Sequence, residues 1–318
     1  MKIFTVGCGR WGSFIAWYLD SIGHEVTLYG REGSNNMLRL LNTRRSGPLE
    51  MPHTVELTTK LDGVLSSDVI IVSIPSQSLD SLMRTLSSFS IKNKTFVLCM
   101  KGLEIDTGRR LSEISRAYLD ESNSVAVWLG PGHVEEFMKG NPNCMVIDSE
   151  NENTKAWLIS EFSSPLIRFY YGADLVGNEI GAATKNVIGI AAGILDGLGL
   201  GALKGALMAR APREISRLIE AAGGSPTSAY GLCHLGDYEA TVFSEYSHNR
   251  AYGESLVTGV VTSGLAEGVY TVRAVMGLAE GYGIDLPICR AVYDVAILGK
   301  PARDTLLSLF ERSLKREF

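Results

Sequence analysis

The feature that most constrains the fold of this 318-residue chain is a glycine-rich segment close to its N-terminus. The segment has the spacing G-x-G-x-x-G and reads Gly7-Cys8-Gly9-Arg10-Trp11-Gly12. It follows a strand-like run at 2–6, opens a helical pattern at 11–22 and precedes a second strand-like run at 25–29. In this setting the first glycine permits a tight turn, the second lets a pyrophosphate approach the backbone, and the third lets helix and sheet pack closely. The motif predicts a dinucleotide-binding unit; a glycine-rich turn without a ligand is the alternative.

The first half of the chain alternates between strand-like and helix-like segments. Further apolar runs of the kind found in strands buried on both faces lie at 68–74, 95–100 and 124–129. Helical patterns lie between them at 78–87 and 107–119. This alternation predicts the α/β class, with a mainly parallel, doubly wound sheet of the Rossmann type.

Beyond residue 174 the pattern becomes almost entirely helical. The predicted helices lie at 176–195, 203–222, 265–282, 287–298 and 303–315. We therefore expect a dinucleotide-binding Rossmann-like domain at 1–175, followed by an all-α C-terminal domain at 176–318 that carries substrate and catalysis. Small-residue helix faces in the second domain would suit a homodimer, although packing between the domains would use the same residues.

Composition narrows the classes of partner. The formal net charge is −5, so we expect no broad attraction to nucleic acid or to an anionic membrane. The longest apolar stretch, 187–195, is closed by Lys185 and Asp196 and is too short to span a bilayer. The cysteines are scattered, form no C-x-x-C pair and are expected to be reduced, in keeping with a cytoplasmic protein: Cys8, Cys99, Cys144, Cys233 and Cys289. No metal site is predicted.

The residues after the second strand bear on the choice of dinucleotide. This position often holds an acid that binds the ribose hydroxyls of NAD. Here the sequence is Leu28-Tyr29-Gly30-Arg31-Glu32. Arg31 is suited to pair with a 2′-phosphate, so we expect NADP(H) to be preferred and NAD(H) to be possible. The alternative is that Arg31 is a solvated turn residue and that Glu32 binds the ribose.

Two lysines are candidates for the chemistry. Lys101 follows a buried strand, at the end of the sheet where open α/β folds hold their ligands. Lys185 lies on the first long helix among glycines, alanines, valine and isoleucine. A charged lysine is costly to keep in such surroundings, which suits proton transfer near neutral pH. A surface turn and a solvated helix face are the respective alternatives.

Taken together, these segments resemble the bacterial NAD(P)-dependent glycerol-3-phosphate dehydrogenases along nearly the whole chain. The most specific stretch runs from Gly177 to Gly197 and includes Gly181-Ala182-Ala183-Thr184-Lys185-Asn186-Val187-Ile188. Other segments match in the expected order: Lys101-Gly102-Leu103-Glu104, Gly130-Pro131, Gly231-Leu232, Leu235-Gly236-Asp237 and Glu267-Gly268.

The resemblance implies a set of roles. Lys185 is the general acid/base, with Lys101 and Asp237 as its catalytic companions. The predicted substrate residues are Lys101, Gly130, Gly132, Lys185, Asn186, Asp237, Ser247, His248 and Asn249. The predicted cofactor residues are Gly7, Gly9, Arg10, Trp11, Gly12, Arg31, Lys101, Val134, His248, Leu265 and Glu267.

Several residues depart from the family's pattern. Arg10 replaces a serine of the glycine loop, Gly132 replaces serine or threonine, and His248 replaces an arginine that helps to bind phosphate in the family. Two further departures are Ala202-Leu203 in place of Asp-Asn, and Ala209-Arg210-Ala211 in place of Thr-Arg-Gly. Arg250 and Lys204 are candidates to supply the missing charge.

Three functions follow from this pattern. The first is reduction of dihydroxyacetone phosphate, a small phosphorylated substrate, to sn-glycerol 3-phosphate, with hydride delivered to the ketone carbon and a proton given by Lys185. The second is the same chemistry on another hydroxy or keto compound, because Gly132 and His248 fall where substrate is expected. The third is a nucleotide-binding sensor without turnover, against which the presence of both Lys101 and Lys185 argues.

Overall fold

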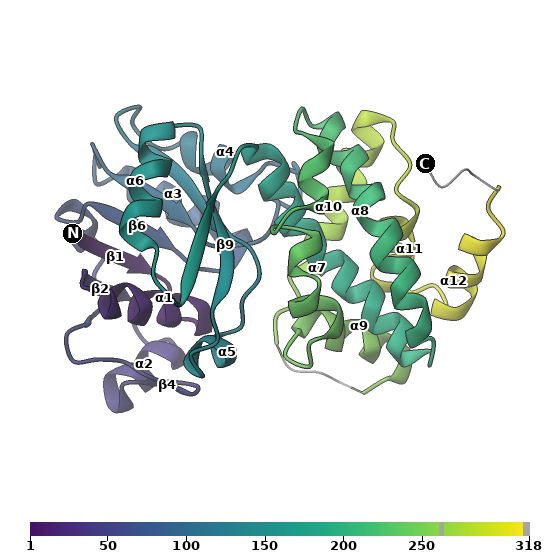
Figure 1. Ribbon diagram of the computed structural model, residues 1–318, viewed down its shortest axis with the longest axis horizontal. Coiled ribbons are helices and arrows are strands. Elements are labelled where there is room, and N and C mark those ends of the chain that lie inside the picture. The colour runs from purple at the N-terminus through teal and green to yellow at the C-terminus, as the bar shows by residue number, and fades with distance from the viewer. Residues whose placement is uncertain (261–263, 314–318) are drawn as a thin grey trace. The chain divides into compact units, whose positions relative to one another are not determined.

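The structure, a computed structural model, describes residues 1–260 and 264–313 (Figure 1). These residues form two compact units. The first consists of Met1–Lys101 and Arg109–Glu179, and the second of Gly102–Gly108 and Ile180–Phe318. The second unit therefore begins after Glu179, inside a helix, and it includes a short segment, Gly102–Gly108, that was expected to belong to the first domain.

The first unit is built on an eight-stranded sheet with the strand order β10-β9-β8-β7-β6-β1-β2-β5. Its strands are β1 (Lys2–Val6), β2 (Glu25–Tyr29), β5 (Glu56–Thr58), β6 (Val69–Val72), β7 (Thr95–Leu98), β8 (Ser124–Leu129), β9 (Asn143–Ser149) and β10 (Ile167–Tyr171). All pairings are parallel except that between β8 and β9. The chain reverses its direction across the sheet between β1 and β6, the place where folds of this kind bind nucleotides.

The predicted Rossmann-type α/β fold is therefore confirmed, with three strands added to the sheet. All four residues of β6 and of β7 are buried, which explains why their sequences are continuously apolar rather than alternating. The strand β5 was not predicted because it is only three residues long, and β9 and β10 were not predicted because they lie outside the βαβ alternation on which the prediction was based. A small hairpin of β3 (Arg45–Ser46) and β4 (Leu49–Glu50) completes the strands described in this unit.

Six helices accompany this sheet in the described part of the first unit. They are α1 (Arg10–Ser21), α2 (Asn35–Thr43), α3 (Leu79–Ser87), α4 (Leu111–Arg116), α5 (Val134–Met138) and α6 (Glu152–Phe162), with short 3-10 turns η1 (Asp62–Leu65) and η2 (Ser76–Ser78). Helices α1 and α6 pack on one face, where their apolar side chains form one cluster with those of the strands. Helices α3 and α4 lie on the opposite face (Figure 1). The sheet is thus covered on both sides, as expected.

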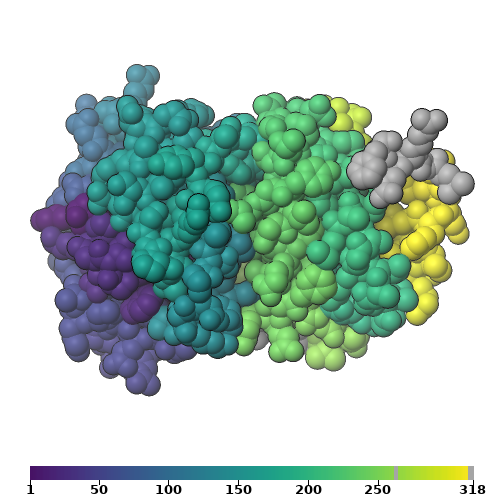
Figure 2. Space-filling model, viewed as in Figure 1, coloured from purple at the N-terminus to yellow at the C-terminus, as the bar shows by residue number. Residues whose placement is uncertain are grey.

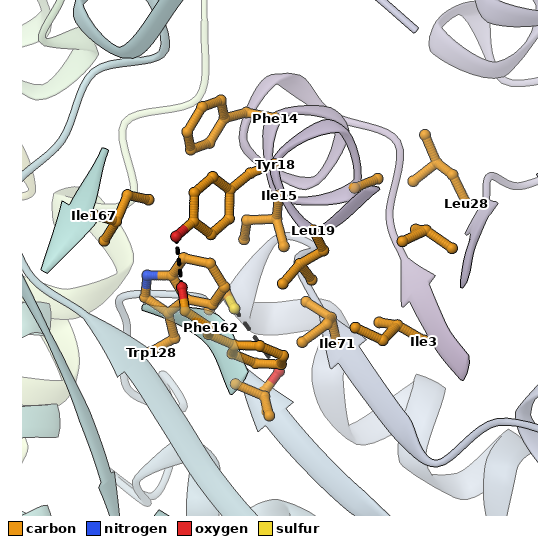
Figure 3. Close-up of a cluster of buried hydrophobic side chains, with 14 of the residues drawn as sticks. Ile3, Phe14, Ile15, Tyr18, Leu19, Leu28, Ile71, Trp128, Phe162 and Ile167 are labelled. Carbon is orange, nitrogen blue, oxygen red and sulfur yellow. Dashed lines mark hydrogen bonds between the residues drawn. The ribbon is translucent and has the colours of Figure 1, made fainter. Parts of the chain in front are cut away.

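The centre of the core holds aromatic side chains from distant parts of the sequence (Figure 3). Phe14 and Tyr18 of α1 face Trp128 of β8 and Phe162 of α6, and all four are buried. The Tyr18 hydroxyl donates a hydrogen bond of 2.5 Å to the Phe162 carbonyl oxygen. Burial raises the pKa of Tyr18 to about 12, so the phenol stays a donor at physiological pH. These contacts fix α1, and with it the glycine loop that precedes it.

A buried carboxylate fixes the chain where it returns to the first unit. Glu179 accepts hydrogen bonds from the Ser112 backbone (2.9 Å), the Ser112 hydroxyl (2.5 Å) and the Arg110 guanidinium (2.8 Å). Burial raises the pKa of Glu179, against the opposing effect of Arg110. The helix predicted at 107–119 begins only at Leu111, because the residues before it belong to the Gly102–Gly108 segment and to this cluster.

All the regular elements that the structure describes in the second unit are helical. Its α-helices are α7 (Leu175–Gly197), which starts in the first unit, α8 (Lys204–Ala221), α9 (His248–Thr258), α10 (Gly268–Tyr282), α11 (Pro287–Ala296) and α12 (Ala302–Phe310). Shorter turns are η3 (Gly201–Leu203), η4 (Pro226–Tyr230), η5 (Leu235–Asp237) and η6 (Glu239–Phe243). The space-filling view shows side chains filling the spaces that the ribbon leaves between these helices (Figure 2).

The all-α second domain is confirmed, with shifted helix ends. Helix α10 starts three residues later than the pattern suggested, and α9 was not predicted. The last predicted helix, 303–315, corresponds to α12, and its final residues lie outside the described part of the chain. Within the described residues we find no helix with the length and apolar character that a bilayer crossing requires.

Glycines on α7 allow other segments to come very close to it. A Cβ atom on Gly193 would lie 1.9 Å from the Arg250 carbonyl oxygen, and one on Gly253 of α9 would lie 2.1 Å from that of Ile190. A Cβ on Gly189 would likewise lie 2.6 Å from a methyl group of Thr241. These glycines are covered from within the unit and are not exposed to a second copy of the chain.

Candidate active site

The three glycines of the nucleotide motif have three distinct surroundings. Gly7 has φ of +115°, and a Cβ there would lie 2.1 Å from the Ser73 carbonyl oxygen. A Cβ on Gly12 would lie 2.0 Å from the Gly7 carbonyl oxygen. A Cβ on Gly9, in contrast, would meet no protein atom within 4 Å. The first and third glycines are thus required by the protein's own packing, whereas Gly9 borders open space that a ligand can enter.

Helix α1 presents an uncovered N-terminus beside this space. Gly9 is its N-cap, no side chain caps it, and its first turn carries no acid. The N–H groups of the first turn and the helix dipole therefore favour a negatively charged ligand at this end. The bare helix end and the open space at Gly9 fit the pyrophosphate of a dinucleotide.

The wall next to the glycine loop comes from α5. Arg10 forms an ion pair with Glu135, and Trp11 lies near Phe137, with ring centroids 6.3 Å apart. A Cβ on Gly132 would lie 2.6 Å from the Phe137 ring. Phe137 is itself buried against Phe14 (centroids 4.8 Å apart) and has little room to move. The aromatic packing therefore explains why this chain has glycine at position 132; Val134, the first residue of α5, is buried next to it.

Arg31 lies close to the glycine loop. It is exposed and follows Gly30 at the end of β2. Burial raises the pKa values of Cys8 and Tyr29, and the positive charge of Arg31 opposes that effect at both groups. The guanidinium is thus near enough to influence the ionisation of Cys8 and Tyr29. A group that binds the adenosine ribose or its phosphate must lie equally close to the glycine loop.

Lys101 and Gly130 are brought together at the ends of neighbouring strands. The Lys101 ammonium donates a 2.7 Å hydrogen bond to the Gly130 carbonyl oxygen. Gly130 has φ of +121°, and a Cβ there would lie 3.1 Å from the Met145 Cα of β9. Both residues stand at the carboxyl edge of the sheet, where the sequence had placed them.

In the second unit, Lys185 and Asp237 form a buried ion pair. The Lys185 Nζ lies 3.3 Å from the Asp237 Oδ2 and donates a 2.8 Å hydrogen bond to the Thr241 hydroxyl. That hydroxyl in turn donates to the Asp237 carbonyl oxygen (2.8 Å). Asp237 is 1% exposed and Lys185 is 8% exposed. An ammonium held in this way has a fixed position, which is what transfer of a proton to one chosen atom requires.

The segment that carries Thr241 has an unusual backbone. Glu239–Phe243 form a single turn of π-helix, and Thr241 follows Asp237 by four residues. Single π-helical turns are rare and occur often at functional sites. Thr241 was not predicted from the sequence, where its spacing from Asp237 was the available signal.

A second group of predicted residues meets around Asn249. Its Nδ2 donates to the Asn186 Oδ1 (3.1 Å), and its Oδ1 accepts from the Gly268 backbone (2.9 Å). Asn249 of α9 thus connects α7 with α10. Its partner on α7, Asn186, is the residue immediately after Lys185. Glu267 is the N-cap of α10, and Leu265, 46% exposed, lies just before it.

Ser247 and His248 lie at the N-terminus of α9. The Ser247 hydroxyl accepts a hydrogen bond from the Arg250 backbone and caps the helix. His248, the first residue of the helix, is exposed, and a Cβ on Gly264 would lie 2.6 Å from its ring. The first turn of α9 contains no acid, so this end also favours an anion.

The two cations considered as replacements for the missing arginine are paired with two acids, Asp196 of α7 and Glu254 of α9. Asp196 accepts hydrogen bonds from Arg250 (2.5 Å) and Lys204 (2.7 Å). Lys204 also donates to the Val242 carbonyl oxygen, and Arg250 to that of Ser244. These two side chains therefore support the fold around α9.

The chain matches two family models. The N-terminal domain of NAD-dependent glycerol-3-phosphate dehydrogenase matches residues 2–155, and the C-terminal domain of the same family matches residues 174–306.

Curated relatives carry the same function in their names. The chain is 35% identical over 331 residues to a glycerol-3-phosphate dehydrogenase [NAD(P)+] of Pelodictyon phaeoclathratiforme, and the match covers 100% of this chain and 99% of that protein. The protein of the same name from Thermoanaerobacter sp. is 34% identical, with the same coverage. Among solved structures, a glycerol-3-phosphate dehydrogenase from Coxiella burnetii superimposes with a TM-score of 0.91 at 26% identity, covering 98% of this chain and 99% of that one.

Proposed function

The chain belongs to the family of NAD-dependent glycerol-3-phosphate dehydrogenases, and from this membership we propose that it reduces dihydroxyacetone phosphate to sn-glycerol 3-phosphate with a reduced nicotinamide dinucleotide. The observation that carries the proposal beyond family membership is the buried arrangement of Lys185 with Asp237 and Thr241. A dinucleotide-binding protein without turnover has no need of a buried, positioned ammonium, which is costly to maintain.

Each residue has a proposed part in the reaction. When bound, the nicotinamide supplies the hydride that reduces the ketone carbon. Lys185 donates a proton from Nζ to the ketone oxygen, is left neutral and recovers a proton from solvent. Asp237 and Thr241 hold Nζ in place, and Lys101 contributes positive charge to the same reaction. The glycine loop and the N-terminus of α1 hold the pyrophosphate.

The substrate phosphate is proposed to bind at the start of α9. Ser247, His248 and Asn249 offer hydroxyl, imidazole and amide donors there, next to a helix N-terminus. Arg250 and Lys204 are paired with Asp196 and Glu254, so their charge is compensated within the fold. We therefore expect phosphate recognition to rely on neutral donors and the helix end.

The function is tested by measuring the oxidation of the reduced dinucleotide through the loss of its absorbance. Purified protein with dihydroxyacetone phosphate and NADPH or NADH is expected to turn over steadily, and the product is identified as sn-glycerol 3-phosphate by mass spectrometry and chiral analysis. Dinucleotide binding without turnover of any ketone would contradict the proposal and favour a sensor.

A second candidate is the same chemistry on a different small ketone, favoured by the neutralised cations around Asp196 and by the histidine at position 248. A panel of ketones with and without a phosphate, compared by kcat/KM, separates the two candidates. Preference for dihydroxyacetone phosphate supports the first; preference for an unphosphorylated or carboxylated ketone supports the second.

We propose that NADP(H) is the preferred dinucleotide, on the strength of Arg31. Arg31→Ala is expected to lower kcat/KM for NADPH by roughly 10–100-fold, the loss expected for a charge-assisted hydrogen bond, and to leave that for NADH nearly unchanged. Glu32→Gln is the matched variant: if Glu32 binds the ribose instead, it weakens NADH use and Arg31→Ala has no effect on NADPH.

We propose a reducing compartment such as the cytoplasm. All five cysteines are present as thiols, and four of them, Cys8, Cys99, Cys233 and Cys289, are buried. Burial raises the pKa of Cys8, Cys99 and Cys289, so their thiolates are scarce and the thiols unreactive.

A further inference from the structure

The buried pair Lys185–Asp237 has a histidine beside it that the reaction does not use. His234 is completely buried and begins the short turn η5 that carries Asp237. Its Nδ1 lies 2.9 Å from the carbonyl oxygen of Gly181 on α7, and its Nε2 lies 2.7 Å from the Tyr238 hydroxyl. The imidazole is therefore held at both nitrogens, by the two elements that supply Lys185 and Asp237.

These two partners determine the tautomer. A carbonyl oxygen only accepts, so Nδ1 carries the proton and donates it to Gly181. Nε2 then has the free lone pair and accepts the hydrogen bond of the Tyr238 hydroxyl. Burial lowers the pKa of His234 to about 4, against smaller opposing effects of the bond to Gly181 and of the charge of Asp237. The ring is neutral near pH 7, and its hydrogen bonds keep one direction.

His234 contacts both the backbone of Asp237 and the side chain of the residue that follows it. The Asp237 backbone N–H donates to the His234 carbonyl oxygen (3.1 Å), and Tyr238, which follows Asp237, is 1% exposed. Asp237 thus lies in the sequence between His234 and Tyr238, which are joined by the hydrogen bond at Nε2.

The other hydrogen bond of the imidazole reaches α7 one helical turn from the catalytic lysine. Gly181 precedes Lys185 by four residues on α7, so both lie on the same side of the helix. A Cβ on Gly181 would lie 3.1 Å from the His234 Cβ, so the glycine is what lets η5 come this close. The Thr184 hydroxyl, 3.4 Å from Nδ1, lies at the same contact.

We propose that His234 is a positioning residue, which ties η5 to α7 through Gly181 and Tyr238 and so keeps the Asp237 carboxylate next to the Lys185 ammonium. The inference rests on the proposed role of Lys185 as proton donor. Without the imidazole, η5 loses one of its side-chain links to α7, and Asp237 and Thr241 are held less firmly at their distances from Nζ.

Two variants at position 234 and one at position 238 separate positioning from simple packing. His234→Ala is expected to lower kcat by roughly 10–100-fold, as displacements of about 1 Å at a catalytic group do, with dinucleotide affinity unchanged. His234→Asn retains an N–H that reaches Gly181 and is expected to recover most of kcat. Tyr238→Phe removes only the hydroxyl and is expected to lie between them.

The control is Leu218→Ala, which truncates a fully buried side chain of α8 in the same unit. It is expected to lower the thermal midpoint while kcat stays at the wild-type value. If His234→Ala also loses only stability, or if His234→Asn loses as much kcat as His234→Ala, the positioning role is wrong.

A measurement without substrate separates this inference from the proposed function. Acetylation of Lys185 by acetic anhydride is measured by mass spectrometry relative to exposed Lys300. We expect a several-fold faster relative acetylation of Lys185 in His234→Ala, because an amine without its nearby carboxylate is less often charged, and no change in Leu218→Ala. Turnover failure of the wild-type protein would overturn only the function, whereas unchanged acetylation in His234→Ala would overturn the positioning role.

Discussion

Lys185→Ala is expected to lower kcat for dihydroxyacetone phosphate by roughly 10²–10⁴-fold, the usual contribution of a positioned general acid. The ammonium is held by Asp237 and Thr241, so no other described group takes over its place at Nζ. Dinucleotide affinity should change little, because the glycine loop belongs to the first unit. Steady-state kinetics and fluorescence titration with NADPH measure the two effects separately.

Two lysine variants identify which property of the side chain matters. Lys185→Arg keeps the positive charge, but a guanidinium does not release its proton in proteins, so this variant should be almost as inactive as the alanine variant. Lys300→Ala, which removes an exposed lysine from an ion pair with Asp294, should retain full activity. An active Lys185→Arg enzyme would mean that charge, not proton transfer, is the role of this residue.

Gly9→Ala and Gly12→Ala are expected to weaken dinucleotide binding for different reasons. A Cβ on Gly9 enters the open space next to the helix end, and its φ of −70° suits alanine, so the protein should keep its stability. Binding should weaken by roughly 10–100-fold, because the backbone no longer approaches the pyrophosphate closely. A Cβ on Gly12 meets the Gly7 carbonyl oxygen and should cost about 1–3 kcal/mol of folding free energy, with the loop displaced as well.

Calorimetric titration with NADPH and thermal unfolding of the same samples distinguish the two substitutions. Gly23→Ala is unsuitable as a control, because its φ of +96° adds strain of its own. Gly205→Ala is suitable, since Gly205 lies on α8 with open space around its Cβ position; it should leave NADPH binding unchanged and raise the unfolding temperature slightly, because alanine is the better helix former. A Gly9→Ala protein that binds NADPH normally would show that the pyrophosphate does not lie against this residue.

The general architecture was predictable because it depends on short-range patterns. Continuous apolar runs, such as that of β6, indicate strands buried on both faces, and the glycine motif indicates the turn between β1 and α1. The antiparallel strand β9 and the segment Gly102–Gly108 were not predictable in this way. Their places depend on pairings and contacts with residues distant in the sequence.

The candidate site was predicted unevenly for the same reason. Lys185 is marked by its apolar neighbours, and Asp237 by the family resemblance. The roles of Thr241 and His234 became visible only from their distances to Lys185, Asp237 and Gly181. Gly132 stays a predicted substrate residue, and only the structure shows that the rings of Phe137 and Trp11 lie beside it.

The glycines of α7 also affect the order in which the second unit folds. Each glycine lowers the intrinsic stability of a helix by about 1 kcal/mol relative to alanine, and α7 contains several. This helix is therefore a poor nucleus by itself and gains its stability when α9 and the segment around Thr241 pack against it. Because the same packing surrounds Lys185, a partly folded chain exposes this lysine to solvent, and the buried arrangement on which its proposed role depends exists only once the native contacts of the unit have formed.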